Sequence, residues 1–357
     1  MNDTDWLTAL AGFGLPGAPS VLASPPTPLG DLLGDIDRHK LIGTLAMAIG
    51  DEALTVDADD RDLVAARHEK AMGEVLLLED VLLQASEALA AAGIDGRVLK
   101  GAALAHMVYP DPAARVFGDN DILVANTDVD AAVAVLAGAG ATRPVPPISA
   151  SFDRRFAKSV TLGWHGNTEL DLHRTLAPGP YGHLIRLDDL FTDPVELILA
   201  GRVVHTLSAE LHLLHGAIHV ALGDVAPRLG NVRDLAMLAA RPSVHVDRVI
   251  ATAERWGCAA PLALGLRATR PLGHTRTAVE RWADDHEISA VDRRRLEAYA
   301  RRDGRFRRQA VASWQVLGWR DRIAFTRALL MPSAANRAAR AGAPSTGVGP
   351  GGRRPPG

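Results

Sequence analysis

Two aspartates one residue apart, Asp119 and Asp121, come directly before a short apolar run at residues 122–124. Residues two apart in a strand project from the same face about 7 Å apart, so both carboxylates would lie at one edge. Such a pair suits Mg²⁺, which prefers hard oxygen ligands and commonly completes its coordination with substrate phosphates. An Asp-x-Asp pair by itself is a weak signal, however, and a solvated turn at the beginning of a strand is the alternative.

A second acidic segment, ELDLHRT, follows later in the chain. Its leucines alternate with Glu169, Asp171 and His173, so one face of the expected strand is apolar and the other carries two carboxylates and an imidazole. We expect a hairpin that turns at residues 165–167 and lies antiparallel beside the first acidic strand, which would bring a third carboxylate to the pair. Three acids at one point repel one another unless cations neutralise them, whereas a plain solvent-facing strand edge needs no cation. The hairpin therefore favours a metal site that includes Asp171.

A strand that turns directly into a helix precedes both acidic segments. The stretch VLKGAALAHM predicts a strand up to Leu99, a turn at Lys100 and Gly101, and a helix that ends before Pro110. A glycine at this turn lets the backbone approach a ligand closely, and the free N–H groups and dipole of the helix favour phosphate. Lys100 adds a positive charge. The pattern is not a Walker A loop, and a tight structural turn is the alternative.

These segments together resemble a known enzyme family. The stretch VLKGAALAHMVYPDPAARVFGDNDILV followed by ELDLHRTL is similar to the uncharacterised nucleotidyltransferase family, a branch of the polymerase-beta-like nucleotidyltransferase superfamily, over about residues 61–330. The resemblance implies that Asp119 and Asp121 bind two Mg²⁺ ions, and that Asp171 ligates the catalytic ion and helps to draw a proton from the acceptor hydroxyl. The metals would stabilise the attacking and leaving oxygens as a nucleoside monophosphate leaves an NTP and pyrophosphate departs.

The resemblance also assigns a nucleotide-binding side to the site. Lys100 and Gly101 fall on the turn that handles phosphate in the superfamily, and Arg115 matches an arginine that the family places just before its acidic strand. Two positions depart from the superfamily. Ala102 stands where a serine is frequent, so backbone N–H groups would have to replace a hydroxyl contact to phosphate. Asn120 stands where an apolar residue is usual, which would leave the core side of the strand less well anchored.

The chain has 357 residues and the composition of an ordinary folded protein, with 47% hydrophobic and 23% charged residues. Its formal net charge of -3 provides no general attraction to nucleic acid, so any contact with a polyanion would have to be local. The single cysteine, Cys258, excludes an intramolecular disulfide and favours a reducing compartment. The N-terminus lacks the features of a signal peptide, and no segment approaches the roughly 18 apolar residues of a membrane span. We therefore expect a cytoplasmic protein with no membrane partner.

The pattern along the chain predicts an α+β fold, in which a nucleotidyltransferase domain with a mixed sheet precedes a helical domain. Residues 1–30 are rich in Pro, Gly and Ser and are expected to be a flexible arm. Residues 31–206 would form the α/β domain, including one long amphipathic helix that ends at Gly93. Residues 207–333 are helical in period. Residues 334–357 have almost no large apolar side chains and are expected to be a disordered tail.

Three histidines, His212, His215 and His219, lie near one face of a predicted helix in the helical domain. Three imidazoles could bind zinc, but the glutamate of a metalloprotease motif is absent and the leucines of a core stripe adjoin them. We therefore favour packed or solvent-edge histidines. Further along, Arg233 and Asp234 would form a local salt bridge, with an interdomain ion pair or a substrate contact as the alternatives.

The function expected from these observations is Mg²⁺-dependent transfer of a nucleotide to a hydroxyl-type acceptor, in a cleft between the two domains. Two alternatives are open. In a non-catalytic relative, the helical domain would bind a protein partner and ATP would show no metal-dependent binding. In an ATP-dependent phosphotransferase, the released product would be ADP and not pyrophosphate. The acceptor is set by loops that sequence patterns do not assemble, so hydroxyls of small molecules, antibiotics, modified peptides and protein side chains all qualify.

Overall fold

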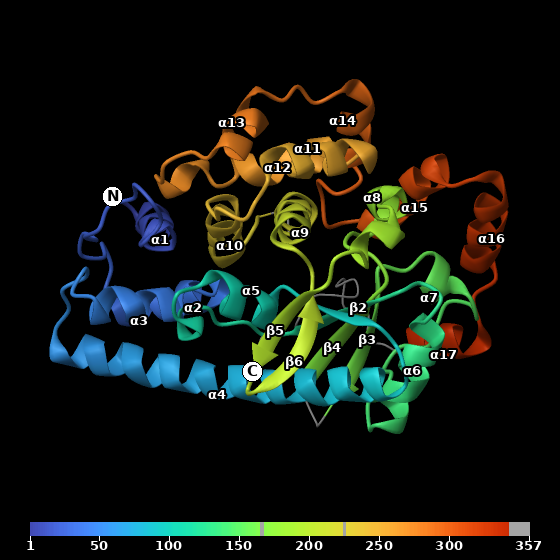
Figure 1. Ribbon diagram of the computed structural model, residues 1–357, viewed down its shortest axis with the longest axis horizontal. Coiled ribbons are helices and arrows are strands. Elements are labelled where there is room, and N and C mark those ends of the chain that lie inside the picture. The colour runs from blue at the N-terminus through green and yellow to red at the C-terminus, as the bar shows by residue number, and fades with distance from the viewer. Residues whose placement is uncertain (165–167, 224–225, 343–357) are drawn as a thin grey trace.

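At the centre of the computed structural model, which describes residues 1–164, 168–223 and 226–342, is a six-stranded mixed sheet (Figure 1). The strand order is β3-β4-β2-β1-β6-β5. The strands are β1 Gly96–Leu99, β2 Asn120–Val124, β3 Ser159–Trp164, β4 Thr168–His173, β5 Val195–Leu199 and β6 Arg202–Thr206. Strand β2 is buried along its whole length, as its apolar run and central place require. The mixed sheet and the helices that follow it confirm the predicted α+β fold.

One side of the sheet is covered by the 34-residue helix α4 (Ala58–Ala91), which runs along the lower edge of Figure 1. Asp57 caps this helix, because its carboxylate accepts a hydrogen bond from the Asp60 N–H at 2.8 Å. Leu78 and other apolar residues of α4 are buried. The helix ends just before Gly93, whose φ of 73° suits a glycine. The prediction of one long helix that ends at Gly93 is confirmed.

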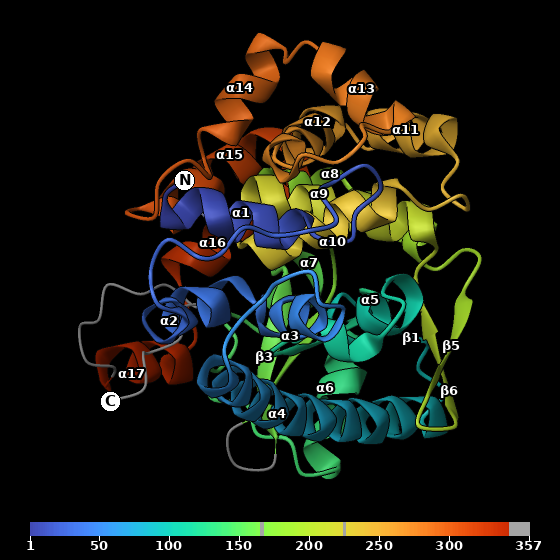
Figure 2. The same cartoon turned by 90° about the vertical axis from the view of Figure 1, so that its left-hand side faces the viewer.

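The other side of the sheet faces a layer of helices, which lies above the strands in Figures 1 and 2. Helix α5 (Gly101–Val108) follows β1, and α9 (Ala209–Leu222) follows β6. His212 Nε2 on α9 lies 2.8 Å from Thr206 Oγ1, and this hydroxyl donates to Val98 O at 2.6 Å. His212 is therefore a packed histidine that ties α9 to the sheet. The helices after α9 are α10 Leu229–Ala239, α11 Val246–Arg255, α12 Ala259–Arg267, α13 Ala278–Asp285 and α14 Ala290–Leu296.

A continuous hydrophobic core connects the sheet with these helices. Its buried side chains extend along the chain from Trp6 to Tyr299, so residues 31–206 and 207–333 share one core, and the boundary between two domains stays a prediction. Cys258 is fully buried in this core, and burial raises the pKa of its thiol to about 12, as expected for a small packed side chain. None of the helices in the described ranges is long and apolar enough to cross a membrane. The shorter helices are α2 Leu29–His39, α3 Ile42–Gly50, α6 Val129–Gly138, α7 Phe152–Arg155 and α8 Gly179–Leu184.

The two acidic strands run in a different relative direction from the one expected. Strand β4 lies parallel, and not antiparallel, to β2, with Asp121 opposite Asp171. After β2 the chain passes through α6 and α7 to the outer strand β3, and the antiparallel β3–β4 pair then brings β4 into the direction of β2. The predicted turn at residues 165–167 lies outside the described residues. The carboxylates still come together, because paired residues in neighbouring strands point to the same face.

The prediction of a flexible arm at residues 1–30 is wrong for its first part, which forms α1 (Asp3–Gly12). Asn2 begins this helix with a capping box. The Trp6 side chain is fully buried, and its Nε1 donates to Ala23 O at 2.9 Å. Burial of the tryptophan and of the leucines on the same helix stabilises this segment, so the Pro- and Gly-rich stretch that follows is held at both ends.

The prediction of a disordered tail at residues 334–357 is wrong for the part that the structure describes, because α17 spans Ala334–Gly342. Asn336 is 1% exposed, and its Nδ2 donates to Pro146 O at 2.7 Å. The contact that places this helix is therefore polar, which a prediction based on apolar content does not detect. Residues 343–357 lie outside the described ranges. The two helices before α17 are α15 Arg305–Val316 and α16 Trp319–Leu330.

Candidate active site

The acidic strands place Asp121 of β2 and Asp171 of β4 directly opposite each other. Asp121 is 3% exposed, whereas Asp171 is half-buried. With His173 they form a group in which one ligand atom of each residue lies within 4.8 Å of the others. Two carboxylates and an imidazole are donors that divalent cations accept, so these residues fit a metal ion.

Asp119, the first aspartate of the predicted pair, is exposed and lies just before β2. It does not belong to the group of three ligand residues. Its charge nevertheless acts on two lysines of the site, Lys100 and Lys158. The structure thus brings Asp121 and Asp171 together and leaves Asp119 beside them on the exposed side.

Lys100 occupies the turn between β1 and α5, next to Leu99, which pairs with Asp121. Its φ of 41° and ψ of -124° lie in a region that residues with a side chain rarely adopt. Lys100 Nζ lies 3.2 Å from Asp121 Oδ2. Burial by itself lowers the pKa of Lys100, but the carboxylates of Asp121 and Asp119 raise it above its ordinary value, so the side chain stays an ammonium.

Gly101 begins α5 at a point where the chain is packed closely. A Cβ at this position would lie 3.2 Å from Phe117 Cδ2 and 3.4 Å from Asp119 O. Within the described residues, the side chain of Lys100 makes no capping hydrogen bond to α5, so the first N–H groups of the helix are suited to an anion. Ala102 follows and is buried, so the backbone and not a hydroxyl offers donors here.

Arg115 is buried and directs its guanidinium at Asp234 of α10. The Nε and Nη2 atoms of Arg115 donate to the two carboxylate oxygens at 2.8 and 2.6 Å, and Nη1 donates to Gly101 O at 3.0 Å. The predicted local salt bridge between Arg233 and Asp234 is wrong. Asp234 pairs instead with Arg115, and Arg233 donates to backbone carbonyls, among them Ala11 O at 2.9 Å. Arg115 therefore joins α10 to the turn at Gly101.

His173 completes the surroundings of Asp121. Its Nε2 lies 2.6 Å from Asp121 Oδ1, and its Nδ1 lies 3.2 Å from Thr175 O. Burial alone would raise the pKa of Asp121, but Lys100 and then His173 hold it well below the usual range, so the group is a carboxylate. The imidazole thus belongs to the site and not to the outer edge of the strand.

Thr161 and Lys158 come from β3 and from the residues before it. Thr161 Oγ1 donates to Asp171 Oδ1 at 2.6 Å, which fixes the orientation of that carboxylate. Burial, followed by the charge of Lys100, lowers the pKa of Lys158, and the site carboxylates only partly oppose this. Lys158 is therefore a second amine beside the acidic group.

Two of the three histidines on α9 approach the site from the helical side. The ring of His215 lies 6.4 Å from that of His173 and 6.4 Å from that of His219, measured between centroids. Burial, and then the positive charge of Lys100, holds the pKa of both His215 and His219 well below the usual range. The sequence predicts that these two histidines and His212 are all packed or solvent-edge side chains. In the structure, His212 contacts Thr206, and the other two lie toward the site.

Asn120 faces the opposite side of the sheet from Asp121. It is 2% exposed, and its Nδ2 donates to Leu78 O of α4 at 2.8 Å. The expectation that an asparagine here anchors the strand poorly is wrong, because a buried hydrogen bond replaces the apolar contact. The departure from the superfamily pattern leaves the acidic face unchanged.

Sequence reasoning assigned no role in the site to several of its residues. His173 had a local signal, since it shares the polar face of β4 with Asp171. His215 and His219 had a signal as imidazoles on one helix face, but nothing in the sequence connected them with the acidic pair. Lys158 and Thr161 had no signal, because only the fold brings them to that pair.

Comparison with known proteins gives the family of the chain. Among solved structures, it is similar to an antigenic nucleotidyltransferase-like protein from Paracoccidioides brasiliensis, with 14% sequence identity, coverage of 58% of this chain and 95% of that chain, and a TM-score of 0.33. No curated protein matches the chain. The family described as uncharacterised nucleotidyltransferase matches residues 28–273, well over half of the chain. The protein therefore belongs to the uncharacterised nucleotidyltransferase family.

Proposed function

We propose that the protein transfers a nucleoside monophosphate from an NTP to a hydroxyl-type acceptor and releases pyrophosphate. The observation that carries this proposal is the position of Asp121 and Asp171 on adjacent strands, directly beside the strand-to-helix turn at Lys100. A carboxylate pair next to an ammonium and a helix N-terminus combines a cation site with a phosphate site. Membership of a nucleotidyltransferase family supports the same class of reaction.

The acidic residues would hold divalent cations and handle a proton. Asp121 and Asp171 would share one ion, and the exposed Asp119 would take part in holding a second one, both Mg²⁺ if the superfamily pattern applies. When bound, such ions stabilise charge on the attacking and leaving oxygens. Asp171 is the more accessible carboxylate of the pair and is oriented by Thr161, so it is suited to accept the proton of the acceptor hydroxyl.

The basic residues would bind the triphosphate. Lys100 and the first N–H groups of α5 offer donors beside the acidic pair, and Lys158, directly before β3, adds a second amine. Arg115 would act on the nucleotide through Gly101, because its own donors are used on Asp234 and on the Gly101 carbonyl. A cytoplasmic setting, which supplies NTPs, agrees with the reducing environment that a single cysteine favours.

One observation supports the non-catalytic alternative. Asp121 already lies against Lys100 and His173, and in a non-catalytic relative these partners would take the place of a metal ion. ATP titration with and without Mg²⁺ separates the two possibilities. An enzyme binds ATP more tightly with the metal, whereas the alternative predicts the same affinity in both titrations.

The reaction is tested by incubating the purified protein with each NTP and a pool of candidate acceptors. We expect pyrophosphate release and a mass gain of one nucleotide on the acceptor; ADP as the product would indicate phosphoryl transfer instead. Asp171→Asn should abolish the reaction. Glu169→Gln is the matched control, because Glu169 is an exposed carboxylate on the same strand and the same face. Equal turnover by Asp171→Asn and Glu169→Gln would refute the assignment.

A further inference from the structure

The acidic pair is bordered by imidazoles as well as by lysines, and the inference drawn from this rests on the proposed function. His173 Nε2 belongs to the group of ligand atoms that lie within 4.8 Å of one another, and it is 2.6 Å from Asp121 Oδ1. His173 Nδ1 lies 3.2 Å from Thr175 O, which can only accept a hydrogen bond. The Asp121 carboxylate also only accepts, so without an ion Nε2–H donates to it, and an ion bound at Nε2 would take the place of that proton while Nδ1–H stays on Thr175 O. Metal-bound histidines are commonly held in this way by a backbone carbonyl.

His215 provides a second, independent indication of a ligand. The side chain is 1% exposed, and within the described residues neither of its ring nitrogens has a hydrogen-bond partner. A buried imidazole is normally paired, because burying an unpaired polar group costs free energy. His212, one turn earlier on α9, shows the usual arrangement, with its ring nitrogen on the Thr206 hydroxyl. The His215 ring lies 6.4 Å from the ring of His173, measured between centroids, so an ion held by His173 would offer the partner that the described residues do not supply.

We propose that the position between Asp121, Asp171 and His173 takes a divalent transition-metal ion in preference to Mg²⁺, with His215 as a further nitrogen ligand from α9. Mg²⁺ strongly prefers oxygen ligands, whereas imidazole suits Mn²⁺, Zn²⁺ and related ions. The Mg²⁺ that accompanies an NTP would instead be held by the phosphates and by the exposed Asp119. The two ions of the proposed reaction would therefore differ in kind, because one has nitrogen ligands and the other has only oxygen.

Mn²⁺ is the probe of choice, because its binding and its ligand nuclei are both observed by electron paramagnetic resonance. The full chain, freed of metal by chelation, is titrated with Mn²⁺ without nucleotide, and Mg²⁺ is then added as a competitor. We expect Mn²⁺ to resist displacement by an excess of Mg²⁺ and its pulsed spectrum to show coupling to nitrogen-14. Labelling of histidine with nitrogen-15 should change that coupling.

Two variants assign the nitrogen ligands. His173→Gln and His215→Gln should each weaken Mn²⁺ binding by at least the roughly 10- to 100-fold that loss of a supporting contact costs a metal site. The matched control is His205→Gln, because His205 is exposed on β6 and touches neither the acidic pair nor α9 in the described contacts. Circular dichroism identifies a variant that fails to fold, and the wild-type spectrum decides the proposal without any variant.

The outcomes separate this inference from the proposed function. Mn²⁺ that binds without nitrogen coupling, or that Mg²⁺ displaces on equal terms, would overturn the inference, even if pyrophosphate is released normally. Nitrogen-coupled Mn²⁺ in a protein that transfers no nucleotide would uphold the metal site and refute the nucleotidyltransferase reaction.

Discussion

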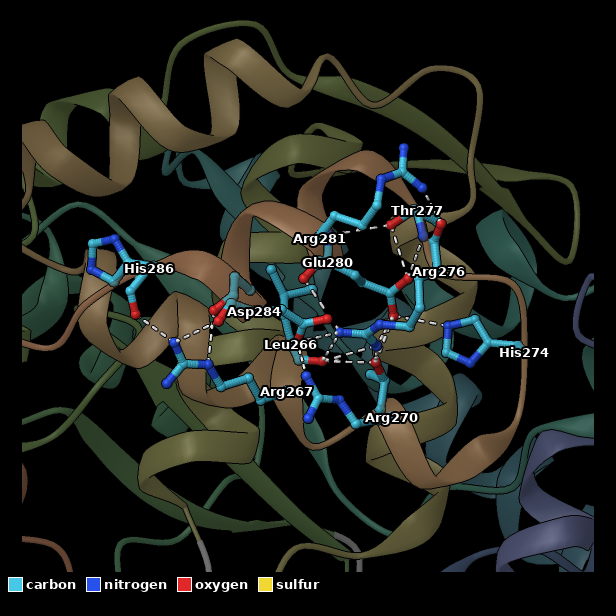
Figure 3. Close-up of polar contacts among 12 residues, drawn as sticks. Leu266, Arg267, Arg270, His274, Arg276, Thr277, Glu280, Arg281, Asp284 and His286 are labelled. Atoms are coloured by element: carbon cyan, nitrogen blue, oxygen red, sulfur yellow. Dashed lines mark hydrogen bonds and ion pairs between the residues drawn. The ribbon is translucent and has the colours of Figure 1, made fainter.

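Two buried carboxylates of this protein, one in the candidate active site and one at Glu280 of α13, have similar partners and different surroundings. Each lies against a histidine and a basic side chain. Figure 3 shows Glu280 with His274, Arg276 and Thr277 around it. Glu280 Oε1 accepts hydrogen bonds from Thr269 at 2.5 Å, from His274 at 2.8 Å and from Arg276 at 3.0 Å. Oε2 accepts two more, from the N–H and the hydroxyl of Thr277 at 2.8 and 2.9 Å. Glu280 is fully buried, and its two oxygens share five donors.

The carboxylate of Asp121 is less completely paired. Among the described residues, it has one contact with Lys100 and one with His173, and the carboxylate of Asp171 lies beside it. Lys100 is held at a positive φ, and His215 nearby has no hydrogen-bond partner within the described ranges. Strain and incomplete pairing are typical of places where a fold is arranged for a ligand.

The difference lies in where the partners come from. All the donors to Glu280 belong to residues 269–280, and one of them forms the capping box of its own helix. Such a network stabilises the local structure and leaves no position open. The partners of Asp121 come from the turn after β1 and from β4, which are far apart in the chain, so the whole sheet is needed to assemble them. We therefore expect substitutions at Glu280 to change stability and those around Asp121 to change activity.

The largest effect is expected for Asp121→Asn. The substitution keeps the size of the side chain and removes the charge that would hold a cation, so nucleotide transfer should fall by on the order of 10³-fold. The midpoint of thermal unfolding should fall as well, because Lys100 and His173 lose the charge that they face, and this outweighs the relief of the like charge beside Asp171. Calorimetry and a pyrophosphate-release assay on the same preparation measure both quantities. A variant that loses stability and keeps activity would reverse the comparison.

Glu280→Gln should lower stability and leave turnover unchanged. His274 and the other donors hold the pKa of Glu280 at about 2, against the tendency of burial to raise it from the ordinary 4.5. A carboxyl with a lowered pKa stabilises the fold above pH 4.5, and this contribution is lost as the pH falls from 4.5 to about 2. At neutral pH the variant should lose about 3 kcal/mol of unfolding free energy.

Denaturant titrations of wild type and Glu280→Gln at several pH values test this expectation. The difference in unfolding free energy between the two proteins should become smaller as the pH falls from 4.5 to about 2. Turnover at a temperature where both are folded should be equal. A constant difference at all pH values would show that the carboxylate charge is not what stabilises α13.

Thr161→Val is expected to have a smaller effect on the active site. The substitution removes the hydroxyl that orients Asp171 and leaves the shape of the side chain, so kcat/KM should fall roughly tenfold. Stability should change by less than about 0.5 kcal/mol, because Thr161 is exposed. Thr142→Val is the control, since Thr142 is also exposed and its hydroxyl bonds a backbone carbonyl, Gly163 O. Equal kcat/KM for both variants would mean that Asp171 does not need the hydrogen bond from Thr161.

The smallest effect concerns the strain at Lys100. Both Lys100→Gly and Lys100→Ala remove the ammonium, so both should impair nucleotide binding. At an ordinary position alanine is the more stable choice by about 0.4–1 kcal/mol. At a φ of 41° the order should reverse. The unfolding free energy of Lys100→Gly, measured by denaturant titration, should exceed that of Lys100→Ala by about 1 kcal/mol. The usual order would show that the backbone relaxes and that no strain is held at this turn.

Local patterns predicted much of the scaffold around the site. The turn from β1 into α5, the strand after Asp121 and the long helix α4 each depend on neighbouring residues, and the structure confirms them. Local patterns failed where long-range packing decides. The Trp6 side chain draws the N-terminal segment into the core, and Asn336 fixes a C-terminal helix by a polar contact.

The sequence by itself determined which side chains are candidates for the chemistry, because residue type and alternation along a strand predict polar faces with Asp119, Asp121 and Asp171. Only the tertiary structure decided which of them meet. The parallel pairing of β2 and β4 joins Asp121 with Asp171, and α9 adds His215 from the other side. Spacing along one chain does not encode such contacts, because they depend on how separate elements pack and not on the conformation of any one of them.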